Sequence, residues 1–215
     1  MRDKTNIPST RPSVPHALSL SHMTSVTLEG THVRLEPLGP DHLDALAEVL
    51  LDPDLWTWSP APVRSRADLE AYVAAALAMR DAGTALPFAT VDVASGRVVG
   101  ATRFGNFVAD HRRVEIGWTV VARDWQRTAV NTEAKLLMLR HAFDALGLNR
   151  VEWKTDALNA RSRAAILRLG AVEEGTLRAH MVTASGRLRD TVYFSVTAPE
   201  WPAVRSQLEA RLARG

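Results

Sequence analysis

The residues best suited to chemistry lie between positions 115 and 162, around the start of a predicted helix. Residues 127–132 follow a strand-like stretch, 114–121, and precede a helical pattern. A helix N-terminus carries backbone amides without intrahelical partners and the positive end of the helix dipole, so a pyrophosphate can bind there without dedicated side chains. The same segment is also compatible with an ordinary helix start that binds no ligand.

A resemblance to a known family makes the phosphate-binding interpretation specific. Residues 118–134, WTVVARDWQRTAVNTEA, resemble the strand, phosphate loop and helix start of the RimJ/RimL-like acetyltransferases of the GNAT superfamily. The family loop reads Gln/Arg-x-x-Gly-x-Gly/Ala, whereas this chain has Ala129 and Asn131 at the glycine positions. The resemblance implies that the cofactor, acetyl-CoA, is held by Trp118, Thr119, Val120, Val121, Gln126, Arg127, Thr128, Ala129, Val130, Asn131 and Thr132.

A second motif lies one predicted helix and one predicted strand further along the chain. Residues 155–171, TDALNARSRAAILRLGA, are similar to the family's Asn-x-x-Ser/Ala helix that ends in glycine. The resemblance implies that Asn159 orients the pantetheine arm of coenzyme A, with Ser162 beside it, although asparagine is also a common helix N-cap. It also implies that strands 114–121 and 151–156 splay apart and leave backbone groups free to bind pantetheine.

Two side chains are the candidates for catalysis. An amine must lose a proton when it attacks a thioester, and the departing sulfur must gain one. Glu115 matches a position where RimL-like enzymes often carry glutamate and could accept the amine proton directly or through water; the alternative is an exposed carboxylate paired with Arg112 or Arg113. Many family members protonate the sulfur with a tyrosine, but Ile166 stands at that place here. Ser162 is therefore the candidate donor, unless its hydroxyl only caps its own helix.

The acceptor side is described by residue type rather than by a motif. The family's fold places five side chains around the acceptor cleft, and aromatic walls with a few polar groups suit a small amine or a peptide N-terminus. Each of these side chains, taken singly, is more often a core or surface residue. The substrate-binding candidates are Trp56, Trp58, Arg103, His180 and Tyr193.

The elements that must position these residues follow from the periodicity of apolar positions. Three-and-four spacing predicts helices over residues 41–50, 65–80, 129–146, 159–169 and 199–214. Alternation predicts strands over 33–38, 88–93, 98–107, 114–121, 151–155, 176–182 and 189–196. The predicted fold class is α+β: a GNAT fold with a central, mostly antiparallel twisted sheet of about seven strands, a V-shaped splay between strands 4 and 5, and flanking helices.

Composition limits the other functional classes. The 215 residues and 46% hydrophobic content suffice for one sizeable core, so we expect a single domain over residues 26–215. The 26 basic and 24 acidic residues leave a net charge of +2, too small a surplus for a nucleic-acid-binding face. The chain has no cysteine, which excludes disulfides, thiolate zinc sites and a cysteine nucleophile. His111, His141 and His180 lack metal-ligand spacing with carboxylates, so no metal is expected.

The N-terminal 25 residues lack the apolar run that a secretory signal or a membrane span needs. We therefore expect a disordered extension over residues 1–25 and a cytoplasmic protein with no membrane partner. The predicted function is transfer of an acetyl group from acetyl-CoA to a primary amine of a small molecule or protein, by direct attack in a ternary complex. The alternatives are a succinyl-CoA or other acyl-CoA donor, and a non-catalytic acyl-CoA-binding regulatory module. The resemblance also implies a homodimer.

Overall fold

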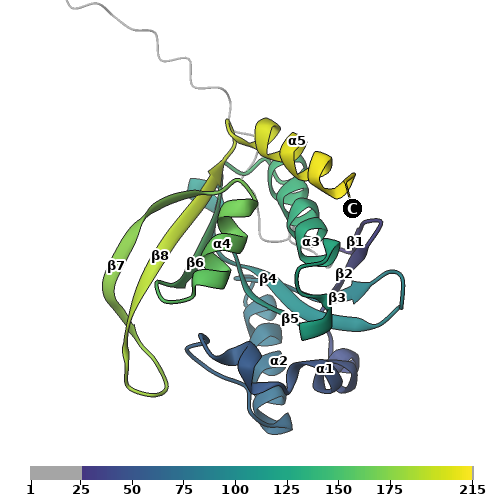
Figure 1. Cartoon of the computed structure of the whole chain (residues 1–215), viewed down its shortest axis with the longest axis vertical. Coiled ribbons are helices and arrows are strands. Elements are labelled where there is room, and N and C mark those ends of the chain that lie inside the picture. Colours follow the sequence, from purple (N-terminus) through teal and green to yellow (C-terminus); the bar gives the residue numbers. More distant parts are fainter. Residues whose placement is uncertain (1–25, 215) are drawn as a thin grey trace, which may run out of the picture.

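A sheet of eight strands forms the centre of the protein (Figure 1). The computed structural model describes residues 26–214, so the extension expected at residues 1–25 lies outside the described residues. Neighbouring strands pair antiparallel, except that β5 and β6 are parallel, and the spatial order is β1-β2-β3-β4-β5-β6-β8-β7. The strands are β1 (Leu28–Glu29), β2 (Val33–Pro37), β3 (Leu86–Asp92), β4 (Val98–Val108), β5 (Arg113–Val121), β6 (Arg150–Asp156), β7 (Val172–Val182) and β8 (Leu188–Thr197).

Within residues 26–214, five α-helices cover the two faces of this sheet. They are α1 (Leu43–Leu50), α2 (Arg66–Asp81), α3 (Ala129–Arg140), α4 (Ala160–Arg168) and α5 (Trp201–Leu212). In Figure 1, α1 and α2 lie on one side of the sheet, and α3 and α5 lie on the other. The predicted α+β class, with a mostly antiparallel sheet flanked by helices, is confirmed. No helix within residues 26–214 is long and apolar enough to cross a membrane.

Alternation along the strands builds two hydrophobic cores at once. On β3, Phe88 belongs to the buried cluster that includes α3, α4 and α5, whereas Ala89 belongs to the cluster with α1 and α2. On β4, Phe104 and Ala101 divide between the two clusters in the same way. Successive side chains of a strand point to opposite faces, so one strand can serve two layers. The central strands are therefore held from both sides, which makes them a rigid base for a site.

β5 and β6 pair over three residues and then separate. The paired residues are Arg113 with Arg150, Val114 with Val151, and Glu115 with Glu152. Beyond this point β5 continues to Val121 and β6 continues to Asp156 without further pairing to each other. The predicted splay between the fourth and fifth strands is confirmed. These strands carry the labels β5 and β6 because a short strand, β1, precedes the strands that the alternation predicted.

A β-bulge interrupts β5 in its diverging part. Two residues of β5, Trp118 and Thr119, oppose the single residue Thr102 of β4. Trp118 adopts a φ of 49°, in the left-handed region that non-glycine residues seldom occupy. A bulge bends its strand and changes the direction of its side chains. Gly105 of β4 leaves room for the redirected indole, since a Cβ there would lie 2.5 Å from the Trp118 ring.

The helix predicted over residues 129–146 changes its geometry near its end. α3 continues as a π-helical turn, His141–Ala145, and Gly147 follows with a φ of 61°. Glycine adopts this left-handed conformation without a steric penalty, which suits it to the position after a helix. The helix and its glycine stop are confirmed, whereas the π-helical turn is not visible in the spacing of apolar residues.

Glu133 of α3 fixes the turn between β1 and β2. Its carboxylate accepts hydrogen bonds from the amides of Thr31, His32 and Val33, at 2.9, 2.6 and 2.8 Å. The side chain is buried, and the turn passes so close that a Cβ at Gly30 would lie 2.5 Å from the carboxylate carbon. Bonds to a charged acceptor are among the strong hydrogen bonds of proteins. Glu133, within the family-like segment 118–134, therefore anchors β1 and β2 to α3.

Candidate active site

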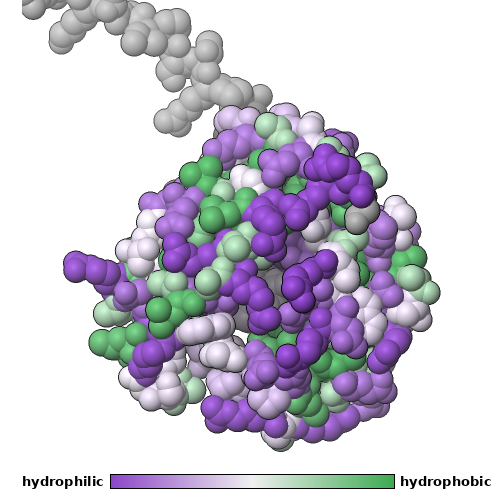
Figure 2. All heavy atoms as spheres, viewed as in Figure 1, coloured by the Kyte–Doolittle hydropathy of each residue, from purple (hydrophilic) through white to green (hydrophobic). Residues whose placement is uncertain are grey.

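A large cavity, with a volume of about 1420 Å³, opens where β5 and β6 separate. In Figure 2, hydrophilic residues surround a hollow near the middle of this face of the molecule. The predicted site residues that line the cavity are Trp56, Trp58, Arg103, Glu115, Trp118, Thr119, Val120, Val121, Gln126, Arg127, Asn131, Asn159, Ser162 and His180. The candidates that do not line it are Thr128, Ala129, Val130, Thr132 and Tyr193. The fold thus gathers most of the candidates around one space.

The start of α3 presents free backbone amides beside this cavity. The amides of Arg127, Thr128 and Ala129 donate no hydrogen bond to another described residue. The Thr128 hydroxyl caps the helix by accepting from the amide of Val130 at 3.3 Å, and Arg127 turns the chain into the helix with a φ of 63°. Amides at a helix N-terminus, together with the helix dipole, form an anion-binding site.

The two replaced glycines do not disturb this helix start. Ala129 and Asn131 are both helical residues of α3, and neither has a positive φ. The conformation therefore does not need glycine at either position, because alanine and asparagine adopt helical angles without strain. The Asn131 Oδ1 atom is buried and has no hydrogen-bond partner among the described residues, although its side chain lines the cavity.

Exposed arginines add positive charge to the cavity. Arg127 and Arg161 lie close to the start of α3, and Arg168 lines the cavity from the end of α4. Arg161 donates to the side-chain oxygen of Gln126 at 3.1 Å, and Gln126 in turn donates to the carbonyl of Val121 at 2.9 Å. This chain of bonds ties the start of α4 to the loop before α3. An anion at the α3 amides would therefore meet several cationic groups.

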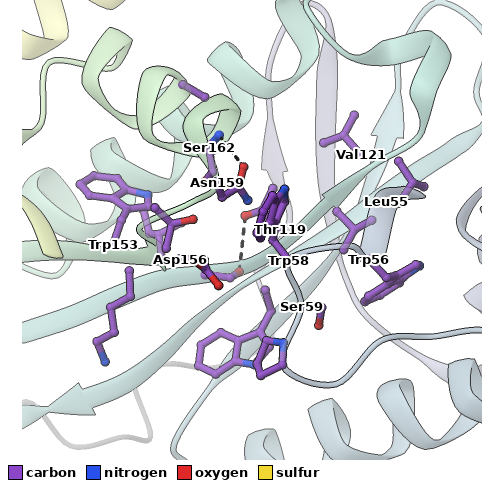
Figure 3. Close-up of a pocket in the computed structure, with 18 of the residues that line it drawn as sticks. Leu55, Trp56, Trp58, Ser59, Thr119, Val121, Trp153, Asp156, Asn159 and Ser162 are labelled. Atoms are coloured by element: carbon purple, nitrogen blue, oxygen red, sulfur yellow. Dashed lines mark hydrogen bonds between the residues drawn. The ribbon is translucent and has the colours of Figure 1, made fainter. Parts of the chain in front are cut away.

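The start of α4 forms the other wall of the splay. Asn159 is the N-cap of this helix, and its Oδ1 accepts from the amide of Ser162 at 3.0 Å (Figure 3). The capping alternative is thus true for Asn159, whose Nδ2 group remains available to a ligand. Ser162 does not cap the helix: its hydroxyl makes no hydrogen bond to another described residue, and its side chain lines the cavity. Ile166, at the family's tyrosine position, is buried in the core.

Glu115 is buried, with 7% of its surface exposed, and it is held by two donors. Its Oε2 atom accepts from Nδ2 of Asn106 at 2.7 Å and forms an ion pair with Nζ of Lys154, also at 2.7 Å. The alternative of an exposed carboxylate paired with Arg112 or Arg113 is therefore wrong. Burial acts to lower the pKa of Lys154, but the contacts with Glu115 raise it overall, so the ammonium stays charged beside the carboxylate.

A buried lysine, not among the predicted site residues, lies between α3 and the bulge. Nζ of Lys135 donates to the hydroxyls of Thr102 at 2.8 Å and Thr119 at 2.7 Å, and no carboxylate pairs with it among the described residues. Burial lowers its pKa from the usual 10.5 to about 7. Its position beside the apolar face of α3 was the available signal, because a lysine there must be buried or must extend to a polar partner.

The acceptor candidates divide into core and cavity residues. Trp56 is almost fully buried, donates to the carbonyl of Leu50 at 2.7 Å and packs edge-on against Tyr72, so its role is largely structural. Trp58 lines the cavity and is labelled in Figure 3. His180 and Tyr193 contact each other edge-to-face, with ring centroids 5.9 Å apart. Arg103 is buried between aromatic rings and lines the cavity.

The residues of the splay fit the chemistry of coenzyme A. A diphosphate needs free amides and cations, which the start of α3 and the neighbouring arginines supply. The amide groups of pantetheine need backbone partners, which β5 offers where it has left β6. Two residues that line the cavity, Asn131 and Trp153, each carry a buried polar atom without a partner among the described residues.

A family model described as "Acetyltransferase (GNAT) domain" matches residues 32–172. The chain belongs to this GNAT acetyltransferase family. The match includes β5, the start of α3 and the start of α4, which together surround the splay. The resemblance seen in the two sequence motifs is thereby confirmed, and the sheet described above is the GNAT fold.

Solved GNAT structures superpose on most of the chain. A GCN5-related N-acetyltransferase from Brucella melitensis is 36% identical, with a TM-score of 0.80 over 87% of this chain and 86% of that one. Mycobacterium smegmatis RimJ in complex with CoA-disulfide is 24% identical, with a TM-score of 0.76 over 88% of this chain and 96% of that one, and this likeness shows the fold. The uncharacterized N-acetyltransferase YoaA of Bacillus subtilis (strain 168) is 30% identical over 47% of this chain. The match spans 56% of that relative's length.

Proposed function

We propose that the protein transfers an acetyl group from acetyl-CoA to a primary amine, by direct attack within a ternary complex. The observation that carries this proposal is the cavity at the splay. Around this one space lie the free amides at the start of α3, an unpaired edge of β5 and the carboxylate of Glu115. A GNAT protein needs these groups to hold an acyl-CoA and to receive a proton from the acceptor.

In this proposal the chain holds acetyl-CoA through groups that need little rearrangement. The amides of Arg127, Thr128 and Ala129 and the nearby arginines bind the diphosphate. The open edge of β5 from Gly117 to Thr119 and the Nδ2 group of Asn159 bind the pantetheine amides. Bound in this way, the molecule supplies a reactive thioester, and the remaining catalytic work falls to protein side chains.

Glu115 and Ser162 handle the protons of the proposed reaction. The C–N bond forms as the C–S bond breaks, and the nitrogen loses one proton to the Glu115 carboxylate directly or through water. The sulfur takes one proton from the Ser162 hydroxyl, which regains one from water, and Glu115 returns its proton to that water, so both side chains end in their starting states. Lys154 and Asn106 both contact Oε2 of Glu115, and these two donors fix the position of the carboxylate.

Two alternatives stay open in this proposal. A succinyl-CoA or other acyl-CoA donor would use the same amides and strand edge, because these contact only the coenzyme A part. A non-catalytic acyl-CoA-binding module would bind the cofactor with no dependence of any reaction on Glu115 or Ser162. The absence of the family's tyrosine at Ile166 is the observation that favours this second alternative.

Thiol release from acetyl-CoA with a library of amines tests the proposal. We expect turnover with at least one amine, a loss of roughly 100-fold or more in kcat for Glu115→Gln, and a smaller loss for Ser162→Ala. Glu152→Gln is the matched control for the first variant. Glu152 is the parallel neighbour of Glu115 and is also buried, but it does not line the cavity, and its close partners are Arg113 and Arg150 at 3.1 Å, with Lys154 further away at 4.0 Å.

The controls separate the three possibilities. Ser206→Ala on the exposed face of α5 controls for loss of a helical serine. Thiol release from succinyl-CoA but not from acetyl-CoA would show that the donor is succinyl-CoA. The protein would instead be a binding module if calorimetry shows that it binds coenzyme A, no acyl-CoA donor releases thiol, and all four variants bind coenzyme A equally well.

A further inference from the structure

Arg103 is a buried guanidinium that opens onto the cavity. Only 3% of its surface is exposed, and it lines the cavity from β4. Its Cζ atom lies 4.9 Å from the ring centroid of Tyr72 and 5.0 Å from that of Trp118. The Trp118 ring reaches this place because of the bulge in β5 and the missing Cβ at Gly105. The bulge in β5 and the glycine at position 105 therefore allow the Trp118 ring to pack against the Arg103 guanidinium.

No carboxylate neutralises this cation among the described residues. Its neighbours with polar atoms are the sulfur of Met79, a weak acceptor at 3.6 Å from Nη1, and the hydroxyl of Tyr72, which stays uncharged because burial raises its pKa. Three acids line the same cavity, and each already has partners. Glu115 pairs with Lys154, Asp156 pairs with Arg187, and Asp68 accepts from the amides of Arg64 and Ser65.

A buried charge without a partner is costly, and this cost points to a ligand. An arginine loses most of its hydration when it is buried, so buried arginines are normally paired with an anion. The exposed arginines at the start of α3 and α4 are hydrated and need no such partner. Aromatic rings against a guanidinium occupy its planar faces and leave the N–H groups at its edge, which match the two oxygens of a carboxylate.

The place of Arg103 on the sheet puts it beside the proposed chemistry. Arg103 pairs with Gly117, and Gly105 pairs with Glu115 in the same ladder. Paired residues point to the same face, so Arg103 and Glu115 lie on one face of the sheet, two residue pairs apart. Strand spacing makes this separation roughly 8 Å between Cα atoms. An anion at Arg103 would therefore lie within a small molecule's length of the proton acceptor.

We propose that Arg103 is a carboxylate-binding residue, so that one of the two reactants carries a carboxylate close to its reacting group. This inference rests on the proposed acyl transfer and names the chemistry of its substrate. The carboxylate belongs either to an amino-acid-like acceptor or to the acyl group of a dicarboxylic acyl-CoA such as succinyl-CoA. Both sources require the same bidentate contact with the guanidinium.

Matched substrate pairs test the proposal. In the acceptor arm, amino acids are compared with their amides, using acetyl-CoA as donor. In the donor arm, succinyl-CoA is compared with acetyl-CoA, using neutral amines as acceptors. The wild type is compared with Arg103→Met, which keeps the length without the charge, and with Arg103→Lys. The control is Arg97→Met, which removes a guanidinium that stacks on Trp125 outside the cavity.

We expect Arg103→Met to lower kcat/KM by roughly 10- to 100-fold for the carboxylate member of one arm, with less than about threefold change for its neutral partner. Arg103→Lys should recover part of this loss, because an ammonium keeps the charge but not the paired N–H groups. Arg97→Met should match the wild type. A preference in the acceptor arm assigns the carboxylate to the acceptor, and one in the donor arm assigns it to the acyl group.

A binding measurement separates this proposal from the proposed function. If no pair is turned over, calorimetry of the same amino acids and of succinate with the coenzyme A complex decides the role of Arg103, while the amine library decides the acyl transfer. Binding that Arg103→Met abolishes and Arg97→Met preserves would support the carboxylate site. Equal binding or equal turnover of carboxylate and neutral members in the wild type would overturn it.

Discussion

At the scale of single residues, burial decides which charged groups can act. The half-buried Lys154 is paired with the buried carboxylate of Glu115, whereas Lys135 is buried against two threonine hydroxyls without a counter-charge. The same kind of side chain therefore has opposite protonation behaviour at two places near the cavity. The pKa of Lys154 is raised and that of Lys135 is lowered to about 7.

Lys135 should make the stability of the protein depend on pH. Its pKa is about 7 in the folded protein and returns to the usual 10.5 on unfolding, so between these values the unfolded chain binds more protons. Stability should then rise with pH from 7 toward 10.5, by up to about 1.4 kcal/mol per unit. We expect Lys135→Met to lack this rise. Urea unfolding at about pH 7.5 and 9.5 should show a difference between the two proteins of roughly 2 kcal/mol over that interval.

The threonine pair provides the check on this interpretation. The hydroxyls of Thr102 and Thr119 lie 2.8 Å apart, so they can bond each other once the lysine is replaced. The variant should fold without buried unpaired hydroxyls and should be at least as stable as the wild type near neutral pH. The same change of stability with pH in both proteins would show that Lys135 is not the titrating group.

At the scale of elements, α3 combines a proposed ligand-binding role at its start with a structural role one turn later. Its start carries free amides beside the cavity, and its second turn holds the β1–β2 turn through Glu133. The three amides that donate to Glu133 belong to the turn that starts the sheet. Fixing this turn also fixes the direction of the helix, and with it the direction of the free amides. The binding task therefore depends on a structural carboxylate.

We predict that Glu133→Ala lowers the free energy of unfolding by roughly 3 kcal/mol, because one buried and two partly buried amides lose a charged acceptor. Urea unfolding measures this loss. Glu70→Ala on α2 is the matched control, since Glu70 is also a helical glutamate but is exposed and pairs with Arg66 at the surface. The control should lose less than about 1 kcal/mol. Equal losses in the two variants would contradict the anchoring role of Glu133.

At the scale of the whole molecule, the sheet consists of two wings joined by a short parallel ladder. β1 to β5 form one wing, and β6, β8 and β7 form the other. The cavity lies where the wings diverge, and α2, α4 and the loop before α3 close its sides. Positive groups gather on the α3 and α4 side, whereas Glu115 and Arg103 lie on the α2 face of the sheet. Under the proposed function, the charged cofactor and the acceptor would therefore bind in separate regions of the cavity.

This separation predicts how salt affects binding. Coenzyme A should bind more weakly as the salt concentration rises, because its phosphates meet exposed arginines and helix amides that salt screens. Pantetheine, which has no phosphate, should be almost insensitive to salt. Calorimetry at about 50 and about 500 mM NaCl should show at least a several-fold change in Kd for coenzyme A and less than about a twofold change for pantetheine. Equal salt dependence of the two ligands would argue against phosphate binding at α3.

Local patterns in the chain predicted the helices, most of the strands, the glycine after α3 and the family. Each of these depends on residues within a few positions of one another, such as alternation along a strand or an N-cap followed by a helix. β1 escaped prediction because two residues carry no periodic signal. The bulge at Trp118 escaped because it depends on how β5 is paired with β4.

The sequence by itself determined that this chain is a GNAT acetyltransferase domain, since the family's motifs are contiguous stretches of backbone. Only the tertiary structure decided the partners of the charged residues. Glu115 pairs with Lys154 of β6, across the splay. Lys135 of α3 donates to the hydroxyls of Thr102 and Thr119 in the sheet. Arg103 packs against the rings of Tyr72 and Trp118. These contacts join positions far apart in the chain. Burial and pairing at such distances depend on the closed fold, and no local spacing encodes them.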